Sequence, residues 1–145
     1  MARRWRDEAT QQAQDDIDAL FAVAMDLVEK QLGSHRGFIP FALAVDHHGA
    51  RSLRTAPAAA ATRSAIIDAL ILDTDRGTHR ALAIVLDVTV PPTDTDAAEF
   101  VVEHAEGTAL QIVVPYTIDG NEGGQVHVER ATTAEGQRRI WGLHL

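Results

Sequence analysis

Cysteine is absent from this chain of 145 residues. Its absence excludes a disulfide framework, a thiolate zinc site and a cysteine nucleophile. The chain also has no window that approaches the roughly 18 apolar residues a membrane span needs. The basic start, residues 1–8, has no apolar run behind it, as an export signal would require. We therefore predict a cytoplasmic protein that does not associate with a membrane, and a reducing compartment fits the lack of cysteine.

Lysine and arginine are missing from residues 81–129, which hold nine acidic residues in a chain of net charge −8. Nucleic acid is excluded as a partner, because its binding needs clustered basic side chains that neutralise phosphates. The acidic block fits two interpretations. It is either a solvated surface that keeps the protein soluble, or a face that attracts a basic protein partner by electrostatic steering.

The sequence lacks the common signatures of catalysis and cofactor binding. None of its three serines lies in a Gly-x-Ser-x-Gly elbow. There is no phosphate loop and no dinucleotide fingerprint. Residues 73–77 resemble the start of a calcium loop, but Ile84 stands where the twelfth position needs a carboxylate. We therefore predict no catalytic residue, no cofactor and no resident metal.

The pattern of apolar residues predicts one α+β domain over residues 1–145. Spacings of three and four residues indicate helices, and alternation indicates an antiparallel sheet of five to six strands. The expected order is α-β-β-α-β-β-β-β, with two helices mainly on one face. The helices are expected at residues 7–32 and 58–72, and the strands at residues 37–46, 50–54, 79–90, 97–106, 110–118 and 126–129. The apolar tail, residues 138–145, is expected to pack back onto the domain.

Three details of this fold are predicted more closely. Asp7 is expected to cap the first helix. Alternate residues from Leu82 to Val90 are expected to form the sheet core beneath both helices. Pro40 and Pro115 each lack a ladder donor. If the first strand lies beside the strand ending at Ile118, the two prolines approach each other, and an intervening strand would refute this arrangement.

Five residues are candidates for a functional site. His47 and His48 stand at the tip of a turn between the first two predicted strands. A metal site there would need a further ligand, and neighbouring strand residues point to opposite faces, so we expect exposed turn histidines. Glu103 and His104 precede the turn at Gly107, with Tyr116 on the next strand. Because Glu103 and His104 alternate across the sheet, they cannot act as a simple acid–base dyad.

Two stretches resemble a small bacterial family of α+β proteins for which no activity is known. They are residues 37–49, with Gly-Phe-Ile-Pro-Phe and Asp-His-His-Gly, and residues 96–116, with Glu-His-Ala-Glu-Gly and Val-Pro-Tyr. This resemblance implies no functional residue. The order of elements is also similar to that of roadblock and profilin-like domains, which act as dimerising or adaptor modules. That similarity concerns the fold alone.

Two functional hypotheses follow. The preferred one is a non-catalytic interaction protein: a homodimer, or an immunity-type module whose acidic block covers a basic toxin. The alternative is a binder of small molecules or metal, or an enzyme, using His47, His48 or His104 beside Tyr116. A deep pocket lined by these four residues would favour the alternative. A flat acidic face or a large two-fold interface would favour the interaction protein.

Overall fold

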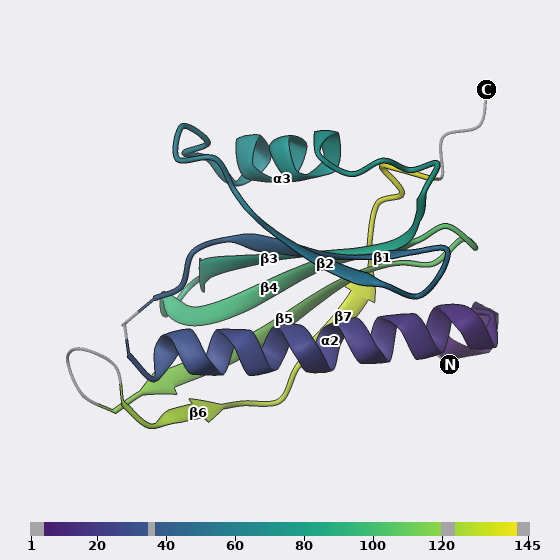
Figure 1. The fold of residues 1–145 in the computed structure, drawn as a ribbon. Coiled ribbons are helices and arrows are strands. Elements are labelled where there is room, and N and C mark those ends of the chain that lie inside the picture. Colours follow the sequence, from purple (N-terminus) through teal and green to yellow (C-terminus); the bar gives the residue numbers. More distant parts are fainter. Residues whose placement is uncertain (1–4, 35–36, 120–123, 142–145) are drawn as a thin grey trace.

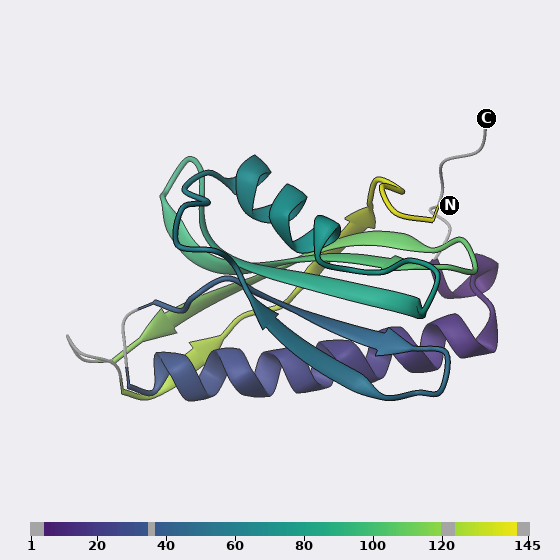
Figure 2. The ribbon, with the colours of Figure 1, turned by 45° about the horizontal axis from the view of Figure 1, so that its top comes forward.

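The computed structural model describes residues 5–34, 37–119 and 124–141. The chain forms one curled antiparallel sheet with helices on both sides (Figures 1 and 2). The strands are ordered β2-β1-β3-β4-β5-β6, and β7 also pairs with β5. The helices are α1 (Trp5–Glu8), α2 (Gln11–Leu32) and α3 (Arg63–Leu72). The strands are β1 (Phe41–Asp46), β2 (Arg51–Thr55), β3 (His79–Val90), β4 (Thr95–His104), β5 (Ala109–Ile118), β6 (Val126–Val128) and β7 (Thr132–Glu135). In the described part of the chain, no helix has the length and apolar character needed to cross a membrane.

The α+β class and the antiparallel sheet are as predicted, but the two main helices do not share a face. Figure 1 shows α2 below the sheet and α3 above it. The reason lies in β3, which buries both of its side-chain rows. Ala81, Ala83 and Val85 pack against α2, whereas Leu82 and Ile84 pack against α3. The row from Leu82 was expected beneath both helices, but of the two main helices only α3 covers it.

Threonines set both main helix starts. The first helix was predicted to begin at Asp7, but the helical conformation is interrupted between α1 and α2. Thr10 caps α2, and its hydroxyl accepts a hydrogen bond from the Ala13 N–H at 3.1 Å. The second was predicted from residue 58, but Thr62 caps α3 and accepts from Ala65 at 3.1 Å. A threonine oxygen satisfies an orphan N–H of the first turn. Asp7 lies inside α1.

The predicted neighbourhood of Pro40 and Pro115 is wrong. β1 pairs with β3, and both β3 and β4 lie between β1 and β5. Pro40 precedes β1, where no ladder donor is needed. Pro115 lies within β5, and its carbonyl accepts from the Glu129 N–H at 2.8 Å. Its missing donor therefore faces the gap between β6 and β7, which pair with other parts of β5.

The end of the chain packs back onto the sheet, as predicted, for the part that the structure describes. Ile140 is buried against the α3 side of the sheet, with Trp141 partly buried beside it. Residues 142–145 of the expected tail lie outside the described residues, as do residues 120–123 of the loop predicted after β5. The strand β7 was not predicted, because Thr132–Glu135 carries no apolar alternation, and all four of its residues are exposed.

Candidate functional site

The turn between β1 and β2 presents His47 and His48 on the surface. The Asp46 carboxylate accepts from the backbone N–H groups of His48 at 2.8 Å and Ala50 at 2.9 Å. The hydrogen bond from Ala50 is the main cause that lowers the pKa of Asp46. Gly49 follows with φ +85, which a side chain rarely tolerates. Both histidines are exposed, and the hydrogen bonds from the backbone to Asp46 shape the turn that presents them.

His104 lies in the interior, fully buried between α2 and the sheet. Its Nε2 lies 2.8 Å from Oδ2 of Asp16. The same carboxylate receives two hydrogen bonds from Arg80, from Nε at 2.8 Å and Nη2 at 3.0 Å. Arg80 also donates to the His47 carbonyl at 3.2 Å. The cluster of Asp16, Arg80 and His104 therefore joins α2, β3 and β4 and reaches the β1–β2 turn.

The hydrogen bonds of this cluster leave no open nitrogen for a substrate. The N–H of Glu106 donates to Nδ1 of His104 at 3.1 Å, so Nε2 carries the proton that is shared with Asp16. Burial alone would raise the pKa of Asp16, but the bonds from Arg80 and His104 outweigh burial and hold that pKa below its ordinary value. We interpret the cluster as a structural ion pair with hydrogen bonds that holds α2 against the sheet.

Glu103 lies on the opposite face from His104, as the alternation predicts. Its side chain is buried, and its carboxylate accepts from three successive backbone N–H groups. The bond lengths are 2.7 Å from Arg139, 3.0 Å from Ile140 and 2.7 Å from Trp141. Residues 138–141, the C-terminal strap, are therefore fastened to β4 by one carboxylate.

Tyr116 is buried and donates its hydroxyl to Oδ1 of Asp87 at 2.6 Å. The N–H of Phe38 donates to Oδ2 at 3.3 Å. Burial raises the pKa of Asp87, and the Tyr116 and Phe38 bonds offset part of that rise. This pair lies near the opposite end of β3 from the His104 cluster, since Asp87 is seven positions beyond Arg80. The structure does not bring Tyr116 together with the histidines.

Two of the engaged acids were missed from the sequence. Neither Asp16 nor Glu99 was among the candidate residues of the sequence analysis. Glu99 is buried and binds Arg63 at 2.8 and 2.6 Å and Gln111 at 2.6 Å. Burial opposes ionisation of Glu99, but these bonds outweigh it and lower its pKa. The partners lie at least 12 positions away in sequence, so no local spacing of residues could have predicted them.

The acidic block of residues 81–129 does not gather on one face. Eight of its nine acids are described, and five of these bond to the fold: Asp87, Glu99, Glu103, Glu106 and Asp119. Glu106 pairs with the Thr10 hydroxyl, and Asp119 with His127. Most of the described acidic side chains of the block therefore form hydrogen bonds within the molecule, and they lie on both sides of the sheet.

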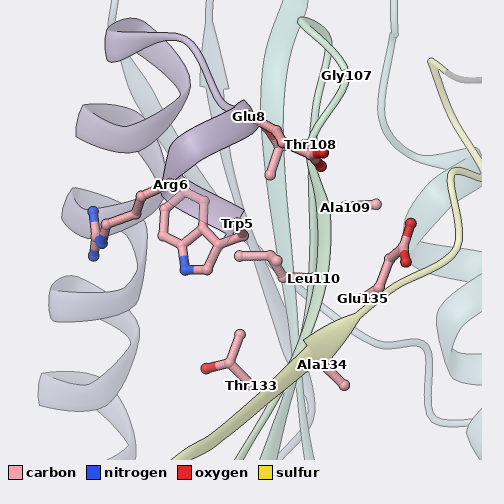
Figure 3. A pocket seen from close by; sticks show the side chains of 10 residues that line it. All are labelled: Trp5, Arg6, Glu8, Gly107, Thr108, Ala109, Leu110, Thr133, Ala134 and Glu135. Carbon is pink, nitrogen blue, oxygen red and sulfur yellow. The ribbon is translucent and has the colours of Figure 1, made fainter. Parts of the chain in front are cut away.

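An open groove with a volume of about 720 Å³ lies between α1 and the strands β5 and β7 (Figure 3). Trp5 and Leu110 both line it, and the Glu135 carboxylate lies on the side away from Trp5 (Figure 3). The guanidinium of Arg6 stacks on the Trp5 ring at 4.4 Å and binds Asp18. None of the five candidate residues lines this groove.

The outer strand β2 is the remaining feature of interest. It pairs with β1 on one side and ends the sheet on the other (Figure 2). Four of its five residues are exposed, and Leu53 at its centre is 54% exposed. Ile39, just before β1, is 63% exposed. We call residues 51–55 the β2 edge.

No group of three His, Cys, Asp or Glu side chains among the described residues is placed to hold a metal ion. Comparison of the chain with protein-family models, curated proteins and solved structures found no match.

Proposed function

We propose that this protein is a non-catalytic interaction module that binds a protein partner through the β2 edge. The exposure of Leu53 in the middle of an edge strand carries the proposal. An edge strand offers unpaired backbone donors and acceptors to another chain, and this is a common mode of recognition. An exposed leucine at the centre of such a strand adds apolar area that a partner can bury.

The ladder shows which backbone groups of β2 are available. Ala56 donates to the Pro40 carbonyl and Asp46 donates to the Ala50 carbonyl, so these two pairs are hydrogen-bonded. Hydrogen-bonded pairs alternate along an antiparallel ladder. The N–H and C=O groups of Arg51, Leu53 and Thr55 therefore point away from β1, toward the outside of the sheet.

Leu53 lies on the same side of the sheet as α2. Leu53 lies opposite Leu43, whose side chain faces α2. Gln31 of α2 accepts from the Ile39 N–H at 3.1 Å, so the helix side that carries Gln31 faces this end of the sheet. Leu27 and Val23, one and two turns before Gln31, lie on the same side and are half-buried.

The alternative site of His47, His48, His104 and Tyr116 has less support. The two turn histidines are exposed, His104 is enclosed and doubly bonded, and Tyr116 is bonded to Asp87 at another end of the sheet. A basic partner of the acidic block stays a prediction. Its support is reduced by the acids that the fold already uses.

A photo-crosslinking amino acid placed at residue 53 tests the proposal in cells that produce the full chain. The expected result is one reproducible adduct, whose second component is identified by mass spectrometry. The matched control is residue 72, because Leu72 is also an exposed leucine, at 86%, but lies at the end of α3 on the other side of the sheet. No adduct at residue 53, or equal adducts at both positions, would overturn the proposal.

A further inference from the structure

We infer that the occupant of the β2 edge is a second copy of this chain, paired antiparallel across a two-fold axis at Leu53. This inference rests on the proposed role of the β2 edge. A two-fold axis gives a closed dimer in which each copy uses the same surface. The sheet would then continue from one copy to the other through two adjacent β2 strands.

The backbone of the β2 edge fits this register. Because Leu53 directs its N–H and C=O outward, the two Leu53 residues face each other as a hydrogen-bonded pair. Arg51 of each copy then pairs with Thr55 of the other in the same way. Three such pairs provide about six interchain hydrogen bonds. The proline that follows, Pro57, lies beyond the paired segment and removes no donor from it.

The side chains fit the same register. Leu53 packs against its counterpart on the α2 side of the sheet, because its neighbour across the ladder, Leu43, faces α2. Arg51 lies opposite Thr55, and Arg54 lies opposite Ser52, so no arginine is directly opposed to another. Like charges directly opposite each other would be unfavourable. The arginines thus avoid direct opposition, and the two Arg54 side chains meet only diagonally.

Ser52 is a further residue on which the register has a consequence. Its Oγ is the one buried side-chain oxygen or nitrogen in the described chain that lacks a hydrogen-bond partner. Buried hydroxyls are normally bonded, and an exception calls for a physical reason. The proposed register places Arg54 of the second copy directly opposite Ser52, where cross-strand side chains are about 5 Å apart at Cβ. Because the Oγ is enclosed within a single copy, the Ser52 side chain has to rotate toward the outer edge before this guanidinium can donate to it.

Cysteine substitution tests the register, because the natural chain has no cysteine. Two Leu53 Cα atoms in a hydrogen-bonded pair are about 5.5 Å apart, within the range that a disulfide spans. Leu53→Cys should therefore form a disulfide-linked dimer under mild oxidation. Thr55→Cys is the matched control, since its two copies would be about 14 Å apart, four residues at about 3.4 Å each. Equal dimer yields from the two variants would overturn the register.

Sedimentation or light scattering of the full chain tests the dimer itself. The wild type should shift with concentration toward twice its mass of 15.7 kDa. Leu53→Lys should weaken the dimer at least about tenfold, because an edge lysine blocks pairing and two buried leucines are lost. Leu72→Lys should leave the dimer unchanged. The two Arg54 side chains share a face about 7 Å apart, so added salt should strengthen the dimer by screening them.

The outcomes separate this inference from the proposed function. A wild type that stays monomeric at every concentration, or a Leu53→Lys dimer as tight as the wild type, overturns self-pairing. If residue 53 crosslinks only to a different protein, the β2 edge is a binding surface but its partner is not a second copy. Should Leu53→Lys fail to fold by circular dichroism, the comparison of Leu53→Cys with Thr55→Cys still decides the register.

Discussion

Asp16 and His104 are 88 positions apart in the sequence, and the carboxylate of one lies 2.8 Å from Nε2 of the other. Arg80 completes the cluster from β3 with two hydrogen bonds to the same carboxylate. The side chains of Asp16 and His104 are 10% and 0% exposed. The buried carboxylate of Asp16 is compatible with the fold only while its partners remain. Removal of one member of the cluster leaves the remaining polar groups buried without a partner, which costs stability.

Substitution of Asp16 by alanine should therefore destabilise the fold strongly. We expect a loss of about 3 kcal/mol in the free energy of unfolding, measured by urea denaturation. Asp18→Ala is the matched control on the same helix, since Asp18 pairs with Arg6 on the surface with both side chains about half exposed. A surface pair of this kind contributes about 0–1 kcal/mol. Equal losses in the two variants would contradict the assignment of Asp16 to a buried structural ion pair.

Acid should destabilise the protein through Asp16 and Glu99. Both have a folded-state pKa below the ordinary carboxyl value, because their hydrogen bonds outweigh burial. Their contribution to stability is thus complete above the unfolded-state pKa of about 4. It is lost as the pH falls through the folded-state pKa. Unfolding free energies between pH 7 and pH 2 should fall more steeply for the wild type than for the double variant Asp16→Asn, Glu99→Gln. Parallel curves would refute this linkage.

Asp87 should behave with the opposite sign. Burial holds its folded-state pKa above the ordinary value, so its contribution favours folding below the unfolded-state pKa and declines as the pH rises through the folded-state pKa. Tyr116→Phe removes the hydroxyl that stabilises the carboxylate at 2.6 Å. The pKa of Asp87 should then rise further, which NMR titration of the carboxyl carbon measures. An unchanged or lower pKa would show that the hydrogen bond does not act on Asp87.

The sequence was sufficient to predict the ranges of the strands with strong alternation. It was not sufficient to predict how the strands and helices assemble. β3 matches its predicted range, because the apolar residues in its twelve positions follow the two-residue period of a strand and not the period of a helix. The same two rows also show that β3 is buried on both faces, which places it inside the sheet. That signal was interpreted as one core row, and the helices were therefore placed on one side. The alanines Ala81 and Ala83 make room for α2 on the other.

The candidate site was less accessible to sequence reasoning. The exposed His47–His48 turn followed from local turn chemistry, because Asp46 and Gly49 act within four residues. The roles of Glu103, His104 and Tyr116 depend on partners 29 to 88 positions away. Such partners are set by register and helix docking, which no spacing along the chain encodes. Thr10 and Thr62 were overlooked as caps for a different reason. Asp7 comes earlier and is a residue type that favours N-caps, and Pro57 comes earlier and is a residue type that favours the first helical position.

Gly136 should not tolerate a side chain. It follows β7, and its N–H donates to the Ala109 carbonyl at 2.9 Å. A Cβ there would lie 2.9 Å from backbone atoms of Leu110, which cannot move aside as a flexible side chain can. Gly136→Ala should cost about 1–3 kcal/mol in unfolding free energy. Gly77→Ala is the control, because its Cβ would meet only the Asp75 carboxylate at 3.2 Å. A smaller loss at residue 136 than at residue 77 would contradict the close approach of β7 to β5.

Release of the C-terminal strap should follow from Glu103→Gln. The carboxylate accepts from the N–H groups of Arg139, Ile140 and Trp141, and an amide offers one oxygen in place of two. Hydrogen bonds to a charged group contribute about 1.5–3 kcal/mol, and 1.4 kcal/mol is tenfold in an equilibrium. Trypsin should therefore cut after Arg138 or Arg139 at least about tenfold faster in the variant. Glu129→Gln, at an exposed acid, is the control. Because the strap covers the α3 side of the sheet rather than β2, loss of the strap should leave dimerisation intact, and a coupled loss would show that the two surfaces communicate.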